Sequence, residues 1–330
     1  MKPSTKPVLV SGIKPSGDLH IGNYIGALSQ WTDIQNDYRC LVFIADYHSI
    51  TVKQEPEKLR AATINLTRAY LAAGMDPKKV TIFKQSDIAG HTELGWILNT
   101  ITKVSELEKM TQYKDKSREQ KKEGPGAGLL NYPTLMAADI LLYQADVVPV
   151  GDDQTQHLEI TRMLGRRFNQ LFGETFVIPK ALVRETGARI MSLDDPTKKM
   201  SKSGSGSNCI FLDDDPVVAH KKIKRAVTDS GSEIHFDEKK KPAISNLLVI
   251  YSALTHISIK ELEIRYTGKA YGEFKEDLAN IVANFLEDFQ ERAKTFSDNE
   301  IKKILSDGAV IAKSISEKTM KAVKTNLGLI

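Results

Sequence analysis

Two lysines and two serines stand close together at Lys199–Ser203 and could close over a polyphosphate. Lys199 and Lys202 are three residues apart, and glycines follow at Gly204 and Gly206. Lysine ammonium groups neutralise phosphate charge, while serine hydroxyls and backbone N–H groups hold the oxygens. A basic surface loop would have a similar composition, so this stretch alone leaves both interpretations open.

A second signal of the same type lies far upstream, at Pro15–Asn23, where a strand leads into a helix. The N–H groups at a helix start are unpaired and favour anions, and Gly22 lets a ligand approach them closely. His20 could donate a ring N–H to a phosphate or to a leaving oxygen; a surface histidine is the alternative. The two signals together are much more specific than either one, and they predict a nucleotide site.

The elements that must position these residues alternate between strand and helix. The apolar pattern predicts strands at 8–10, 41–45, 80–83 and 147–150. It predicts helices at 21–34, 59–73, 93–104 and 132–143, and a further helix that follows residue 154 and ends at 172. Such alternation predicts an α/β fold with a doubly wound, Rossmann-like parallel sheet, whose ligands bind beyond the carboxyl ends of the strands. The charged stretch 114–122 is expected to be a solvated loop.

Strand signals vanish in the last third of the chain. Asp215 and Pro216 are a good N-cap and first-turn pair for a basic helix. Further helices are expected at 247–254, 262–266, 274–289 and from 301 onward, broken at Gly268, Gly272 and Gly308. We therefore expect a sheet domain over 1–210 and a helical domain over 211–330, whose final helix packs back on the sheet domain.

Composition restricts the class of protein. The 330 residues are 41% apolar and 27% charged with a net charge of +4, which is ordinary for a soluble globular protein. Cys40 and Cys209 have no Cys-x-x-Cys spacing, so a structural zinc or iron–sulfur site is not expected. No signal-peptide core is present, and no run approaches the ~18 apolar residues of a membrane span. We expect a cytoplasmic protein.

One apolar helix carries a carboxylate. Tyr132, Met136, Asp139 and Tyr143 are spaced by four, three and four residues and so share a helix face. A carboxylate buried there needs a partner. An indole N–H only donates, and a carboxylate only accepts, so the face could bind an indole ring. A core aspartate that caps a loop is the alternative.

The histidine and lysine motifs resemble the signatures of class I aminoacyl-tRNA synthetases, here His20-Ile21-Gly22-Asn23 and Lys199–Ser203. Further sequence segments make the chain similar, over essentially its whole length, to the bacterial tryptophanyl-tRNA synthetases. These segments are Ser11–Gly17, Met136–Leu141, Pro149–Gln154 and Gly187–Met191.

This resemblance implies an ATP site, a tryptophan site and three catalytic residues. The implied ATP-binding residues are Lys14, Pro15, Ser16, His20, Gly22, Asn23, Gly151, Asp152, Asp153, Ile190, Lys199, Met200, Ser201, Lys202 and Ser203. The implied tryptophan-binding residues are Tyr132, Met136, Asp139, His48, Val148, Val150 and Gln154. The implied catalytic residues are Lys199, Lys202 and His20.

The resemblance also implies partners. They are ATP with Mg2+ and no dedicated protein metal site, L-tryptophan, tRNA(Trp) read by a helical anticodon-binding domain, and a second copy in a homodimer; neither DNA nor a membrane is expected. The chain departs from the family pattern at Lys14, where relatives usually have Gln, at Val10, where an aromatic residue is common, and at Gly204, where Asp is common.

Three alternatives stay open at this level. A tyrosyl-tRNA synthetase would share the fold and both motifs, a nucleotidylyltransferase would share the motifs without binding RNA, and an inactive RNA-binding relative would share the fold. The Met136 and Asp139 phrase and the 151–154 phrase favour tryptophan. The helical tail argues against the nucleotidylyltransferase, and the intact lysine motif argues against the inactive relative.

Overall fold

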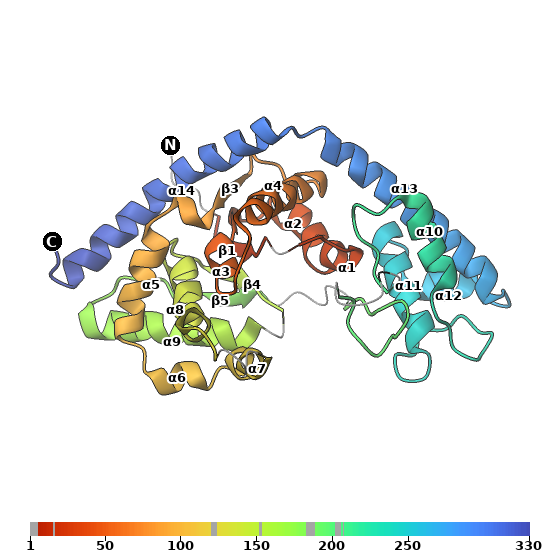
Figure 1. The fold of residues 1–330 in the computed structure, drawn as a ribbon, viewed down its shortest axis with the longest axis horizontal. Coiled ribbons are helices and arrows are strands. Elements are labelled where there is room, and N and C mark those ends of the chain that lie inside the picture. The colour runs from red at the N-terminus through yellow and green to blue at the C-terminus, as the bar shows by residue number, and fades with distance from the viewer. Residues whose placement is uncertain are drawn as a thin grey trace.

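The computed structural model describes residues 6–15, 17–119, 124–151, 154–182, 189–201, 206 and 208–330. A parallel sheet with helices on both faces forms one end of the molecule, and a group of C-terminal helices forms the other (Figure 1). No single helix within the described ranges is long and apolar enough to cross a bilayer; the bent pair α11 and α12, given below, reaches that length and apolarity only together.

The sheet has five strands in the order β3-β2-β1-β4-β5, and every pair is parallel. The strands are β1 Val8–Ile13, β2 Arg39–Ile44, β3 Val80–Lys84, β4 Val147–Pro149 and β5 Lys180–Leu182. The chain winds outward from β1 in one direction and then returns to continue on the other side. The carboxyl ends of β1 and β4 therefore form the switch point at which α/β proteins bind ligands. The predicted fold class is confirmed, although β5 was not predicted.

The helices of the sheet region follow the strands in turn. They are α1 Ile21–Asn23, the π-helix η1 Tyr24–Leu28, α2 Ser29–Ile34, α3 Asp46–Ser49, α4 Pro56–Ala72, the 3-10 helix η2 Gln85–Asp87, α5 Gly90–Thr100, α6 Val104–Glu108, α7 Thr111–Glu119, α8 Ala127–Leu141 and α9 Thr155–Phe172. The loop predicted over 114–122 was wrong for residues 114–119, because these residues belong to α7. Lys, Glu, Gln and Arg are good helix formers, so a charged stretch can be a solvated helix.

Successive residues of the strands point to opposite faces, and each face has its own apolar core. Leu9 and Val42 lie in the core that α2, α4, α11 and α13 cover. Val10 and Leu41 lie in the core that α5, α8, α9 and α14 cover. Nearly continuous apolar strands are what a sheet covered on both faces requires.

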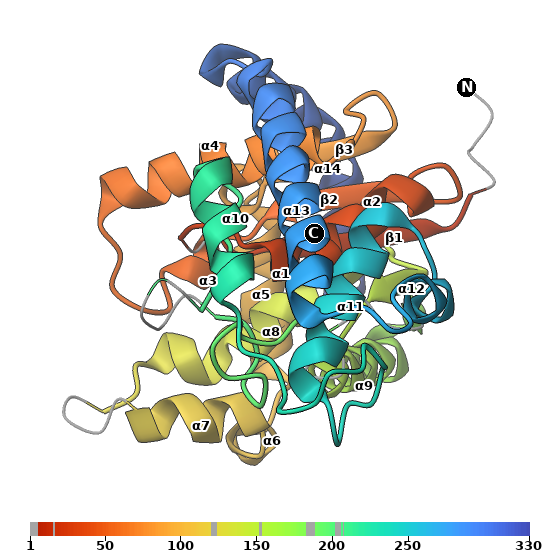
Figure 2. The ribbon, with the colours of Figure 1, turned by 90° about the vertical axis from the view of Figure 1, so that its right-hand side faces the viewer.

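The C-terminal helices are α10 Pro216–Arg225, α11 Pro242–Thr255, α12 Ile259–Arg265, α13 Tyr271–Lys294 and α14 Asp298–Asn326. Figure 2 shows α10 and α11 on either side of α13. The Asp215 side chain caps α10, as predicted, by accepting from the N–H groups of Val217 and Val218. Gly268, with φ +76°, ends the segment after α12, as predicted, whereas Gly272 lies inside α13 and breaks nothing.

The predicted break at Gly308 was also wrong, since α14 runs through it. A Cβ atom at this position would lie 1.9 Å from the carbonyl oxygen of Ile82 on β3. The glycine is thus where the helix lies directly against the edge strand, which no larger residue permits. Further along, Lys324 pairs with Glu93 of α5 at 2.6 Å. The last helix leaves the C-terminal group and runs along the sheet (Figure 1).

Candidate active site

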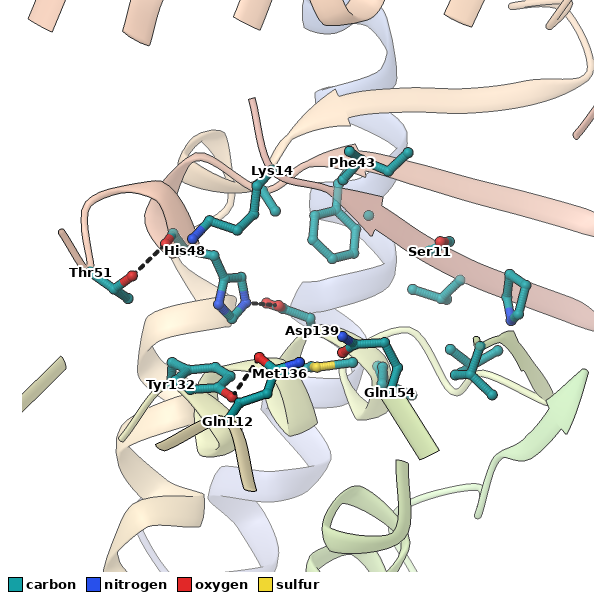
Figure 3. A pocket seen from close by; sticks show the side chains of 18 of the residues that line it. Ser11, Lys14, Phe43, His48, Thr51, Gln112, Tyr132, Met136, Asp139 and Gln154 are labelled. Carbon is teal, nitrogen blue, oxygen red and sulfur yellow. Dashed lines mark hydrogen bonds and ion pairs between the residues drawn. The ribbon is translucent and has the colours of Figure 1, made fainter. Parts of the chain in front are cut away.

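A cavity of about 340 Å³ opens beyond the carboxyl ends of β1, β2 and β4, at the switch point (Figure 3). Its wall combines β1 and the following loop, the end of β2 with α3, one face of α8, and β4 with the loop after it. All seven residues predicted for the tryptophan site line it: Tyr132, Met136, Asp139, His48, Val148, Val150 and Gln154.

Asp139 is the most buried charged group of this cavity, with 1% of its surface exposed. Its Oδ2 accepts from His48 Nε2 at 2.7 Å, and its Oδ1 accepts from Gln85 Nε2 and His91 Nδ1, each at 2.7 Å. Burial raises the pKa of this carboxyl, but the charge of His48 and the hydrogen bonds from His48 and His91 outweigh burial and lower the pKa to about 2. Asp139 is therefore a carboxylate at neutral pH.

Two partners of Asp139 did not appear among the predicted site residues. Gln85 directly follows β3, so the rule that ligand residues collect at carboxyl strand ends could have found it. His91 lies in the first turn of α5 and has no such signal. Tyr143, predicted on the same face as Tyr132, lies just beyond the end of α8, and its Oη bonds His91 Nε2 at 2.8 Å rather than lining the cavity.

Tyr132 forms the opposite wall. Its Oη bonds His157 Nε2 at 2.5 Å and donates to Gln112 Oε1 at 3.2 Å, and its ring lies edge-on to His48 with centroids 6.2 Å apart. Burial raises the pKa of the Tyr132 phenol to about 12, so it stays protonated. The aromatic wall is thus held by α7 and α9, from which Gln112 and His157 come.

The predicted nucleotide residues meet at a second place, around the start of α1. His20 immediately precedes α1, and its backbone N–H donates to Asn23 Oδ1 at 3.0 Å. A Cβ atom on Gly22 would lie 3.0 Å from His20 Nδ1 and 3.4 Å from Ile190 Cβ. The upstream motif therefore lies directly against the segment that leads to the lysine motif.

Backbone hydrogen bonds connect that segment to the described part of the lysine motif. Met200 N–H donates to the Ile190 carbonyl at 3.0 Å, and Met191 pairs with Lys199 in an antiparallel bridge. Lys199 is exposed, whereas the Met200 side chain is buried in the core. The Ser201 carbonyl accepts from Asn208 Nδ2 at 3.3 Å.

One side chain of α11, that of Asn246, forms hydrogen bonds with the backbone of this segment. Asn246 Oδ1 accepts from the Met191 N–H at 2.8 Å, and Asn246 Nδ2 donates to the Met191 carbonyl at 3.0 Å. Asn246 is 6% exposed. The sequence carried no signal for this residue, which brings a C-terminal helix into contact with the nucleotide side.

The remaining predicted ATP residues are dispersed. Lys14 lines the 340 Å³ cavity and, together with Pro15, also a larger cavity of about 920 Å³ that extends between α4 and α13. Gly151 is exposed, and its carbonyl accepts from the Gln154 N–H at 2.9 Å. The other predicted residues lie outside the described part of the chain: Ser16, Asp152, Asp153, Lys202 and Ser203.

Known proteins resemble this chain in sequence and in fold. Residues 2–287 match the family of tRNA synthetases class I (W and Y). The tryptophan–tRNA ligase of Caldanaerobacter subterraneus subsp. tengcongensis is 50% identical over 321 residues, which cover 97% of this chain and 98% of the relative. The chain belongs to the bacterial tryptophan–tRNA ligase family.

Solved structures agree with that family. Tryptophanyl-tRNA synthetase from Mycoplasma pneumoniae is 37% identical with a TM-score of 0.90, and 98% of each chain is covered. The Campylobacter jejuni enzyme complexed with ADP and tryptophan is 37% identical with a TM-score of 0.83, covering 97% of this chain and 99% of its own. The predicted resemblance is confirmed, and the chain is an aminoacyl-tRNA synthetase of the tryptophan rather than the tyrosine branch.

Among the described residues, no group of three or more His, Cys, Asp or Glu side chains is arranged to hold a metal ion. The imidazoles around Asp139 instead donate to a carboxylate, as the distances above require.

Proposed function

We propose that this chain activates L-tryptophan with ATP, forming tryptophanyl-adenylate and pyrophosphate, and then transfers the amino acid to the 3′ end of tRNA(Trp). The observation that carries the amino-acid part is Asp139, a buried carboxylate on the wall of an aromatic cavity at the switch point. Carboxylate is the natural acceptor for an indole N–H. Relatives at 50% identity over nearly the full length support the same substrate.

Activation needs no nucleophile from the protein. An oxygen of the tryptophan carboxylate attacks the α-phosphorus of ATP, a new P–O bond forms, and the bond to pyrophosphate breaks. The protein's contribution is to align the two substrates and to stabilise charge that builds on pyrophosphate. We assign the second task to Lys199, Lys202 and His20, and the close packing of Gly22 on His20 and Ile190 supports a joint site.

The ATP-binding residues of the proposal are those that the resemblance implies. The ADP and tryptophan in the Campylobacter jejuni relative support a nucleotide beside the amino acid. Mg2+ would enter with ATP, and we assign it no protein ligand and no step.

We further propose that residues 1–210 are the catalytic domain, that residues 211–330 recognise the anticodon, and that the active species is a homodimer. The basic face of α10 supports RNA binding, because Lys221 and Arg225 are exposed there. The α14 contacts with β3 and α5 link the two parts.

Pyrophosphate exchange into ATP, run separately with each standard amino acid, tests the proposal. We expect exchange with tryptophan and little with tyrosine or phenylalanine, since a site built around a buried acceptor rejects side chains that leave it unpaired. Aminoacylation of a tRNA(Trp) transcript tests the second step. Preferential exchange with tyrosine, or no exchange with any amino acid, would overturn the proposed substrate or the proposed reaction.

A further inference from the structure

A buried row of hydrogen bonds lies behind the cavity and has no part in the adenylation chemistry. Tyr143 Oη bonds His91 Nε2 at 2.8 Å, and His91 Nδ1 bonds Asp139 Oδ1 at 2.7 Å. The exposed fractions of Tyr143, His91 and Asp139 are 1%, 0% and 1%. Three polar side chains withdrawn from water this completely are stable only if each donor meets an acceptor.

The positions of the protons follow from the partners. Asp139 is ionised and only accepts, so His91 Nδ1 carries a proton and donates it. Burial, and then the charge of Asp139, raise the pKa of Tyr143, so its phenol keeps its proton. The Tyr143 O–H therefore donates to the Nε2 lone pair, so each nitrogen of the His91 ring has a hydrogen-bond partner.

Counting acceptor sites shows which part of Asp139 is left for a ligand. A carboxylate has about four lone-pair sites, two on each oxygen. Oδ1 accepts from both Gln85 and His91 and is filled. Oδ2 accepts from His48, which lines the cavity with it, and keeps one further site. The donors behind the cavity thus determine which oxygen faces the substrate.

We propose that His91 is a positioning residue for amino-acid selectivity: its Nδ1–H, with the Gln85 amide, pins Oδ1 so that the open site on Oδ2 meets the indole N–H. His91 contacts no substrate and acts only through Asp139. This inference rests on the proposed function, because it takes tryptophan as the substrate.

A merely structural role for His91 makes a different prediction. Its ring packs among Phe43, Phe83 and Tyr143, with centroid distances of 5.6, 6.2 and 5.4 Å. If packing were its whole role, any replacement of similar shape would behave alike. His91→Leu and His91→Asn form a matched pair, because the two new side chains have nearly the same shape and only Asn offers an N–H near the position of Nδ1.

The experiment measures pyrophosphate exchange by the full-length enzyme with tryptophan and with benzothienylalanine, in which sulfur replaces the indole N–H. For His91→Leu we expect the KM for tryptophan to rise about ten- to a hundredfold, the usual effect of losing a hydrogen bond to a charged group. The KM for ATP and the KM for benzothienylalanine should change little, so the preference for tryptophan over benzothienylalanine should be largely lost. His91→Asn should retain most of the selectivity.

Tyr143→Phe gives an independent test that leaves the ring packing intact. Removing the phenolic O–H takes away one of the two hydrogen bonds that orient the His91 ring, and we expect a two- to tenfold rise in the KM for tryptophan alone, about the effect of one neutral hydrogen bond. If His91→Leu does not fold, as judged by circular dichroism, the result with Tyr143→Phe decides whether the inference holds.

Three results would overturn the inference. They are equal losses in His91→Leu and His91→Asn, equal losses for both amino acids, and unchanged tryptophan selectivity in Tyr143→Phe. Failure of the wild-type enzyme to exchange with tryptophan would instead overturn the proposed function, so the two failures are distinguishable.

Discussion

The two halves of the proposed active site are built in different ways. The amino-acid corner, formed by Asp139 with His48, Gln85 and His91, is held by side-chain hydrogen bonds between buried groups. The nucleotide edge, formed by 20–23 and 189–201, is held mainly by backbone hydrogen bonds between irregular segments. A neutral ring is recognised by a fixed, dry acceptor, whereas a polyphosphate is held by charges that can close over it. We therefore expect the corner to be rigid and the edge to be adjustable.

The largest effect should follow from breaking the corner at its centre. Asp139→Ala leaves three buried donors without their acceptor and removes the proposed acceptor of the indole N–H. A hydrogen bond to a charged group is worth about 1.5–3 kcal/mol, so we expect tryptophan exchange to fall about a hundredfold, with a much smaller change for 1-methyltryptophan. The measurement is exchange activity for both ligands in both proteins.

The control for that variant is Asp307→Ala, an exposed carboxylate that pairs with Lys303 on α14. This control should retain wild-type exchange. Equal depression of both ligands by Asp139→Ala would make Asp139 a structural residue and would remove the rigid corner from the comparison.

A second variant should deform the corner without removing any polar group. A Cβ atom on Gly12 of β1 would lie 2.4 Å from Phe43 Cε2, and both residues line the cavity. The ring must therefore move, and overpacking of this kind costs about 1–3 kcal/mol. For Gly12→Ala we expect the KM for tryptophan to rise about tenfold, within that range, while the KM for ATP changes little. Adding Phe43→Leu should relieve the clash; if the double variant is no better than Gly12→Ala, the ring is not the cause.

The nucleotide edge should respond to loss of its support from α11. Asn246→Ala removes both hydrogen bonds to Met191, each worth about 0.5–1.5 kcal/mol. We expect the KM for ATP to rise about fivefold, the effect of roughly 1 kcal/mol, with the KM for tryptophan unchanged. Asn246→Asp keeps the oxygen that accepts from the Met191 N–H but loses the amide that donates to the Met191 carbonyl. Its KM for ATP should therefore lie between that of the wild type and that of Asn246→Ala. An equal rise in the KM for tryptophan would show that a change at the edge also alters the corner, so that the two parts do not respond independently.

The smallest effect is expected on α10, outside both halves. Lys221 is exposed, whereas Lys222 donates to Asp214 at 2.7 Å and to the Cys209 carbonyl at 2.9 Å. Lys221→Gln should leave stability unchanged and lower the slope of tRNA affinity against salt by about one phosphate contact. Lys222→Gln should lower the melting temperature instead. Unchanged tRNA affinity and salt dependence in Lys221→Gln would place the RNA contact elsewhere.

Most of the fold could be predicted from local patterns, and the errors have physical causes. Four strands were predicted because each is a short apolar run between turn residues, while β5 has only three residues, Lys-Ala-Leu, and no alternation to detect. Gly308 was taken for a helix break, but its role is close contact with β3, a strand distant in the sequence. A glycine signals either a bend or a close approach, and only the neighbour decides which.

By itself, the sequence predicted the proposed site: two phosphate-type motifs, the strands that precede them and seven of the residues that line the 340 Å³ cavity. These are local properties, because the spacing of residues on one helix or at one strand end is enough to place them on a common face or edge. Only the tertiary structure decided what holds them. Gln85, His91 and Asn246 reach Asp139 and Met191 from other elements, and hydrogen bonds between distant segments leave no periodic trace in either segment. The residues proposed for the reaction could be predicted from the chain, whereas the groups that orient them depend on which elements the fold packs together.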